Sequence, residues 1–366
     1  MNTQVIWDKL RAENIVSGKM PIQGQLNHPW YIRLIQGFAG WLAALFLVGF
    51  FAFAFEFLFK TPNRVLLFSI GAMCSIVSYL IFRSKKSDFL AQFAMAISLC
   101  GQTLVAIALF WNFSMRNENA FFILGAYQLA LTFLLPNYLH RLLTAGFALT
   151  ALLIGSNLHG IWGLGTAFSA TAVSFIWLKE NHWGTKKQLW EPIGYGLVIT
   201  LIISQSLLVG KDLLFWSRGH NNTWLFSHAP LLASVLVALV LLNVLWVIVK
   251  ENKLAIDSKE AVFIAIVGVA FVLISFKIYG LSSGLLITLL GFMRGRKVLL
   301  ALGLFAIVGF FSWYYYNLEQ TLLVKSIILM VLGFVMLVAY FVHKSIYSPK
   351  TQSDTIAKST FKFKKL

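Results

Sequence analysis

Long apolar runs follow one another along almost the whole chain, and they restrict its fold more than any other feature. The runs GWLAALFLVGFFAFAF and APLLASVLVALVLLNVLWVIV reach or nearly reach the roughly 20 residues that a helix needs to cross a bilayer. Only 12% of the residues are charged, whereas a soluble domain carries about 25%. So few charged residues cannot cover a soluble surface, and the sequence therefore predicts an all-α, polytopic membrane protein.

Breaks in hydropathy divide the chain into about twelve predicted transmembrane helices. We place them at 34–58, 65–82, 89–111, 120–136, 142–156, 160–178, 193–210, 229–249, 261–278, 281–293, 298–316 and 319–342. The N-terminal segment carries charges where a signal peptide has its apolar region, so the first span is expected to act as an uncleaved signal. The predicted organisation is a cytoplasmic segment with a short amphipathic helix (1–30), a transmembrane bundle (31–343) and a basic cytoplasmic tail (344–366).

The formal charge of +17 is distributed unevenly between the two sides of this predicted bundle. Of the 30 lysines and arginines, 23 lie in the N-terminal segment, the connections after even-numbered spans and the C-terminal tail, and 7 follow odd-numbered spans. Cytoplasmic loops are enriched in Lys and Arg, so we expect both termini in the cytoplasm. The basic charge is then explained by topology and by the lipid bilayer, and no nucleic-acid partner is expected.

Sequence signals for catalysis or cofactor binding are weak. The chain has no P-loop and no H-E-x-x-H pattern, and its seven histidines are scattered. The segment GLSSG (280–284) matches the hydrolase pattern G-x-S-x-G, but it follows a predicted helix, and small residues also make a tight turn between helices. We predict no catalytic residue, no cofactor and no metal ligand, and we lean against an enzyme.

Polar side chains inside the predicted spans are few and mostly neutral. Glu56 and Lys277 lie within about a turn of the membrane interface, where long charged side chains reach water. Neutral polar contacts are available from Gln36, Gln92, Gln102, Gln128 and Asn157. A transporter would need a polar path, for example through Gln102, Asn157 and Lys277, and the sequence does not show one clearly.

The segment SWYYYNLEQTLLVKS (312–326) joins the last two predicted spans. Tyr314, Tyr315 and Tyr316 fall at the predicted outer interface, which tyrosine favours. Glu319 begins the last span, where its charge suits the helix dipole. Lys325 lies six residues further on, about 120° away around the helix, so the two are poor partners within one helix. Lys325 is therefore expected to reach outward to the interface, to a neighbouring helix or to another protein.

The same region resembles the C-terminal signature of a bacterial membrane family, domain of unknown function 4401. That signature is approximately G-F-x-R-G-R-[RK], a glycine-rich apolar span, and Y-Y-Y-x-L-x-x-T-L-L-x-K-S. The openings WDKLRAENIVSG and HPWYIRLIQGFAGWLAALFLVGF are also similar to the start of the family. The matching C-terminal residues are Gly291, Phe292, Arg294, Gly295, Arg296, Lys297, Tyr314, Tyr315, Tyr316, Leu318, Thr321, Leu322, Leu323, Lys325 and Ser326.

The resemblance implies partners and no catalytic residues. Members of the family are often encoded beside another multi-pass family, domain of unknown function 2157, and beside a single-pass family with a G-D-Y-x-x-L-x-Y motif. The leading hypothesis is that the protein is a non-catalytic subunit of a membrane or envelope assembly. The alternative is a transporter or flippase for a small or lipidic solute. A membrane-embedded enzyme is the third hypothesis. The expected partner or lipid contacts are Tyr314, Tyr315, Tyr316, Glu319, Lys325, Ser326, Arg294 and Arg296.

Overall fold

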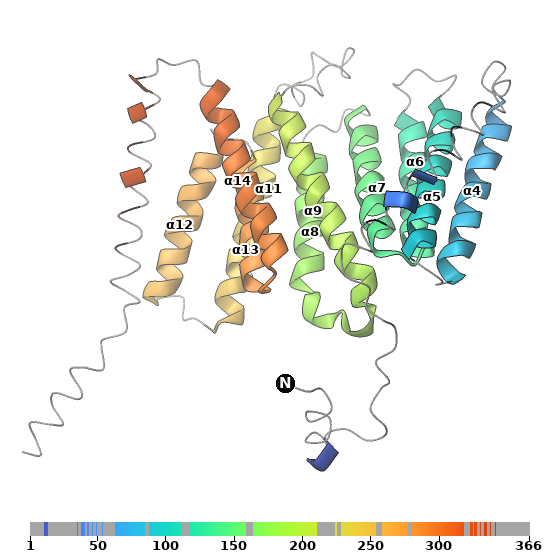
Figure 1. Ribbon diagram of the computed structural model, residues 1–366. Helices are drawn as coiled ribbons and strands as arrows, with labels where there is room; N and C mark the ends of the chain where they lie inside the picture. The colour runs from blue at the N-terminus through green and yellow to red at the C-terminus, as the bar shows by residue number, and fades with distance from the viewer. Residues whose placement is uncertain are drawn as a thin grey trace, which may run out of the picture. The chain divides into compact units, whose positions relative to one another are not determined.

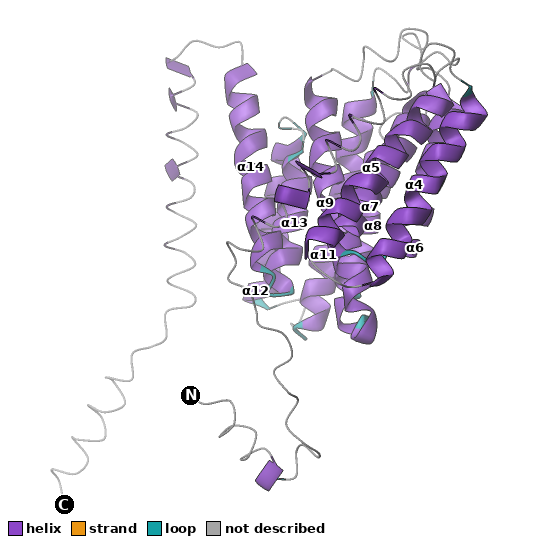
Figure 2. Cartoon of the chain, turned by 45° about the vertical axis from the view of Figure 1, so that its right-hand side comes forward, coloured by secondary structure: helices purple, strands orange, loops and turns teal. Residues whose placement is uncertain are grey.

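The described part of the chain is entirely helical. The computed structural model describes residues 63–84, 88–110, 118–158, 164–210, 228–253, 258–276, 278 and 280–317, together with scattered residues elsewhere between 11 and 341 (Figure 1). Within these ranges every regular element is a helix, and no strand occurs (Figure 2). The predicted all-α class is thus confirmed for this part of the chain.

Ten α-helices and two short 3-10 turns make up the regular structure of these ranges. Each of the ten predicted spans from the second to the eleventh overlaps one of the ten α-helices. The helices are α4 (Arg64–Ser84), α5 (Asp88–Phe110), α6 (Glu118–Leu134), α7 (Tyr138–Leu158), α8 (Leu164–Leu178), α9 (Lys187–Gly210), α11 (Ala229–Glu251), α12 (Lys259–Ser275), α13 (Leu281–Met293) and α14 (Lys297–Asn317), and the turns are η1 (Glu180–His182) and η2 (Gly184–Lys186).

Five of the described helices are long and apolar enough to cross a membrane. They lie within α4, α5, α7, α11 and α14. Shorter apolar helices, α6, α8, α12 and α13 or parts of them, accompany these five. Of the predicted N-terminal segment only residues 11–13 are described, and the first and last spans are described only at scattered positions. Glu56 and Lys277 lie outside the described residues.

The chain divides into two compact units, one up to Val247 and one from Ile248 onward. In the first unit α4 packs along α5, α6 along α7, and α9 along both α7 and α8. The contact between α4 and α5 depends on glycine, because a Cβ atom on either Gly71 or Gly101 would lie 2.6 Å from the carbonyl oxygen of the other. The Ser78 hydroxyl also donates across this pair to the Ala94 carbonyl oxygen, at 2.7 Å. Small residues let helix backbones approach in this way in membranes.

Helix α9 begins at Lys187, six residues before the predicted start, and it contains Pro192. Proline has no backbone N–H, so the carbonyl group of Gln188 loses the hydrogen bond that residue 192 would otherwise donate. A side chain from α7 supplies the missing donor, because Arg141 Nη1 lies 3.2 Å from the Gln188 carbonyl oxygen. The proline is therefore accommodated inside the helix by a tertiary contact.

In the second unit α13 packs against α12 and, more extensively, against α14. The GLSSG segment forms the beginning of α13, where Ser282 and Ser283 are both buried. Gly280 caps the helix with a positive φ of 87°, and a Cβ atom there would lie 2.8 Å from the Phe310 ring of α14. The segment thus makes a tight helix–helix contact, as its small residues predict.

Candidate functional site

Six buried polar side chains form a stripe across three helices of the first unit. They occur as pairs four residues apart, a spacing that puts both members of a pair on one face of a helix. Each is at most 5% exposed. We call this set the polar seam: Ser98 and Gln102 on α5, Gln128 and Thr132 on α6, and His140 and Thr144 on α7.

The turn between α6 and α7 positions the histidine of the seam. Pro136 lies in the three-residue connection after α6, and Asn137 precedes α7. The Asn137 side-chain oxygen accepts from the His140 backbone N–H at 3.0 Å. This is a side-chain cap of the helix N-terminus. The local sequence PNYLH therefore places the imidazole on the first turn of α7.

Hydrogen bonds join the imidazole to α5. Ser98 Oγ lies 2.8 Å from His140 Nε2, and Gln102 Nε2 lies 3.1 Å from the same ring nitrogen. Gln102 Nε2 also donates to Ser98 Oγ at 3.1 Å. With the Gln102 amide nitrogen turned toward the ring, Nε2 of His140 accepts, and the neutral ring then carries its proton on Nδ1.

Two threonines join α7 to α6 in the same seam. The Thr144 hydroxyl donates to the His140 carbonyl oxygen at 2.9 Å and accepts from the Thr132 hydroxyl at 3.0 Å. Together with the contact between Ser98 and His140, these bonds join α5 to α7 and α7 to α6. Buried polar networks of this kind fix which helix faces meet.

Three polar atoms of the seam are buried and have no hydrogen-bond partner among the described residues. They are His140 Nδ1, Gln102 Oε1 and Gln128 Oε1. Turning the Gln102 amide by 180° would present its oxygen to the imidazole and leave its nitrogen unpaired instead. The Phe82 ring also meets the imidazole edge-on, with centroids 5.9 Å apart.

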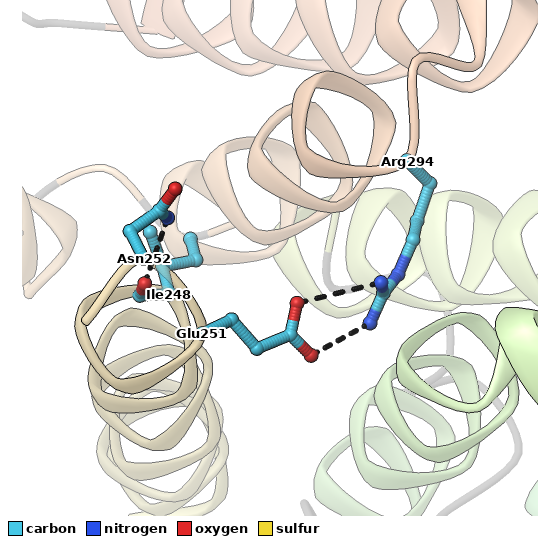
Figure 3. Close-up of polar contacts among 4 residues, drawn as sticks. All are labelled: Ile248, Glu251, Asn252 and Arg294. Atoms are coloured by element: carbon cyan, nitrogen blue, oxygen red, sulfur yellow. Dashed lines mark hydrogen bonds and ion pairs between the residues drawn. The ribbon is translucent and has the colours of Figure 1, made fainter.

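A second polar contact lies in the C-terminal unit, at the turn between α13 and α14. Both nitrogens of the Arg294 guanidinium fork reach the Glu251 carboxylate, at 3.1 and 3.4 Å (Figure 3). The Arg294 side chain is 6% exposed and that of Glu251 is 46% exposed. At the end of α11, beside this ion pair, the Asn252 amide donates to the Ile248 carbonyl oxygen at 2.8 Å.

The turn that carries Arg294 explains the glycine of the G-F-x-R-G-R pattern. Gly295 has a φ of +63°, a left-handed conformation that disfavours residues with a Cβ atom. Its N–H donates to the Phe292 carbonyl oxygen at 3.1 Å, and the Arg296 N–H donates to the Gly291 carbonyl oxygen at 2.9 Å. This pair of bonds closes the end of α13. The turn therefore directs Arg294 toward Glu251.

The residues predicted as partner or lipid contacts lie at separate places along the chain. Arg294 and Arg296 lie together in the α13–α14 turn, and Tyr314, Tyr315 and Tyr316 form the last turn of α14. Tyr316 is 79% exposed, and its ring meets that of Tyr315 edge-on. The Ser326 hydroxyl donates to the Leu323 carbonyl oxygen. Glu319 and Lys325 lie outside the described residues.

The sequence alone did not predict that the residues of the polar seam form one site. Gln102 and Gln128 are predicted polar contacts and do lie in it, but Ser98 and His140 were not predicted to meet. Asn157 lies 17 residues after His140 on α7, about 25 Å away at 1.5 Å per residue. The available signal was the recurrence of polar pairs four residues apart within apolar runs. In the described part of the chain no three His, Cys, Asp or Glu residues cluster as a metal site.

These features define the class as an all-α protein with several helices of membrane-spanning length and apolarity. The chain belongs to the family described as Domain of unknown function (DUF4401), whose sequence profile matches residues 29–345. This match confirms the resemblance to the family and extends it through the middle of the chain. The opening segment WDKLRAENIVSG precedes the matched region. No curated protein and no solved structure matches the chain.

Proposed function

We propose that the protein is a multi-pass protein of a bacterial inner membrane, with about twelve spans and both termini in the cytoplasm. The five helices of membrane-spanning length support this placement. The distribution of Lys and Arg supports the orientation, because basic residues are retained on the cytoplasmic side. In this arrangement Arg294 and Arg296 face the cytoplasm, and the tyrosine triplet at the other end of α14 faces the periplasm.

Within that membrane we propose a role as a non-catalytic subunit of an envelope assembly. The observation that carries this proposal is the surface of α14, which has the lowest buried share of the five membrane-length helices, 22%. This helix ends in the tyrosine triplet of the family signature. Phe305 and Trp313 are exposed on it, and so is Tyr316. Aromatic side chains on a little-covered helix are suited to a protein contact at the interface.

The partners that the resemblance implies are proteins of the two families encoded nearby. The test is co-expression of the full-length chain with these proteins, gentle purification in native lipid, and quantitative mass spectrometry of the recovered complex. We expect Tyr316→Ala and Lys325→Ala to lower recovery of the partner several-fold. The matched control is Tyr138→Ala, which removes an exposed tyrosine at the start of another helix, α7.

The outcomes separate this role from its alternatives. Loss of the partner in Tyr316→Ala with full recovery in Tyr138→Ala supports the subunit role, provided both variants elute as folded protein. A wild-type chain that is purified without either partner contradicts it.

A transporter or flippase is the second candidate, and the polar seam is the observation that favours it. Buried polar side chains inside membrane helices are costly and usually line a solute path or a relay. In that case Gln102→Leu should abolish flux of a small solute in proteoliposomes, while Tyr316→Ala should leave the flux unchanged. Flux equal to that of empty liposomes would eliminate this candidate.

A further inference from the structure

Three basic side chains from helices far apart in the sequence lie at one end of the first unit. Arg83 is in the last turn of α4, Arg141 is in the first turn of α7, and Lys187 begins α9. Arg83 and Lys187 are exposed, and Arg141 is half-buried. We call these three residues the basic cluster.

Two tertiary contacts bring these helix ends together. The ring contact between Phe82 and His140, whose centroids are 5.9 Å apart, joins the end of α4 to the start of α7. The bond from Arg141 Nη1 to the Gln188 carbonyl oxygen, at 3.2 Å, joins the start of α7 to the start of α9. Each residue of the basic cluster takes part in one of these contacts or is the sequence neighbour of a residue that does.

The charge of the basic cluster is not neutralised by the described part of the chain. Within those residues no carboxylate forms an ion pair with any of the three side chains. Glu191 lies one turn after Lys187 on α9, but it is half-buried and does not pair with that lysine. Like charges held near one another repel, so an anion placed among them would be bound favourably.

The surroundings of the basic cluster indicate which anion it would bind. Arginine and lysine are the usual ligands of phosphate groups. Ile76 and Leu80, each 60% exposed, continue the face of α4 that carries Arg83 for two turns away from the helix end. A free phosphate ion would leave this apolar surface unused, whereas a phospholipid would place its phosphate at the charges and its acyl chains along α4.

Basic pockets between membrane helices on the cytoplasmic side are known to bind anionic lipid headgroups. We infer that the basic cluster is a binding site for an anionic phospholipid, whose phosphate lies between the ends of α4, α7 and α9. The inference rests on the membrane placement proposed above, in which this end faces the cytoplasm, and it does not depend on the subunit role.

The experiment titrates the full-length protein in detergent with phosphatidylglycerol or with phosphatidylcholine of the same acyl chains, and native mass spectrometry measures binding of the first lipid. We expect the wild-type protein to bind phosphatidylglycerol several-fold more tightly than phosphatidylcholine. The double variant Arg83→Gln/Lys187→Gln keeps Arg141, whose bond to Gln188 supports α9. Each charge near an anionic lipid contributes roughly five-fold, so this variant should bind phosphatidylglycerol about 25-fold more weakly.

The matched control is Lys250→Gln, which removes an exposed lysine from the last turn of α11 and should leave the binding unchanged. Equal affinity of the wild-type protein for the two lipids would overturn the inference, and so would equal phosphatidylglycerol binding by the double variant and the control. Loss of the preference when inorganic phosphate is added would show that the site takes a free anion and not a lipid.

These outcomes are distinguishable from failure of the proposals on which the inference rests. A protein that bound neither lipid would contradict the membrane placement itself. The subunit role is tested separately, at Tyr316, and none of these lipid measurements changes that test.

Discussion

The bond between Ser98 and His140 gives a quantitative prediction about how α5 and α7 are held together. Two single substitutions, Ser98→Ala and His140→Phe, and their combination form a double-mutant cycle. The cycle isolates the pairwise interaction from the other effects of each substitution. It is suited to this seam because each single variant also changes contacts with Gln102.

The expected coupling follows from the geometry. The 2.8 Å separation of Ser98 Oγ and His140 Nε2 is that of a well-formed hydrogen bond, and both residues are fully buried. Hydrogen bonds between membrane helices contribute about 0.6 kcal/mol on average and up to about 1.7 kcal/mol. Since Gln102 also donates to the ring and can partly replace the hydroxyl, we expect a coupling of about 1 kcal/mol.

The free energy of unfolding can be measured by SDS titration of the protein in bicelles, followed by tryptophan fluorescence. Thr103 on α5 supplies the control cycle, because its hydroxyl bonds within its own helix to the Leu99 carbonyl oxygen. Thr103→Ala and His140→Phe should therefore be additive. A Ser98–His140 coupling below about 0.3 kcal/mol would refute the structural interpretation of the seam, since that is the size of the deviation expected for independent sites.

Two further predictions concern the α13–α14 turn and the topology. Gly295→Ala should lower the free energy of unfolding by about 1–2 kcal/mol, because Gly295 has a φ of +63°. The control Gly309→Ala should not lower it, because its added Cβ atom meets nothing within 4 Å. Equal losses of stability in the two variants would contradict the argument. In a chain with Cys74 and Cys100 replaced by alanine, a membrane-impermeant maleimide added to intact cells should label Asn119→Cys and spare Thr185→Cys. The reverse pattern would invert the proposed orientation.

Local signals in the sequence anticipate much of the helical structure. Apolar runs predict a helix at every described segment between 64 and 317, because a backbone surrounded by hydrocarbon must satisfy its hydrogen bonds within one segment. The Arg294-Gly295 step also predicts the end of α13, since a glycine after an apolar helix favours a left-handed terminus. The early start of α9 was missed, because Pro192 normally argues against a helix interior and the Arg141 contact that compensates for it comes from α7.

The sequence by itself therefore determined the class of protein, the positions of most of the helices and the family. Only the tertiary structure decided which faces meet. His140 lies 42 residues from Ser98, Arg294 lies 43 residues from Glu251, and Arg141 lies 47 residues from Gln188. The hydropathy of the sequence does not predict these pairs, because helices in a bilayer are apolar on most sides. Their mutual orientation is then set by backbone approach at small residues and by a few buried hydrogen bonds.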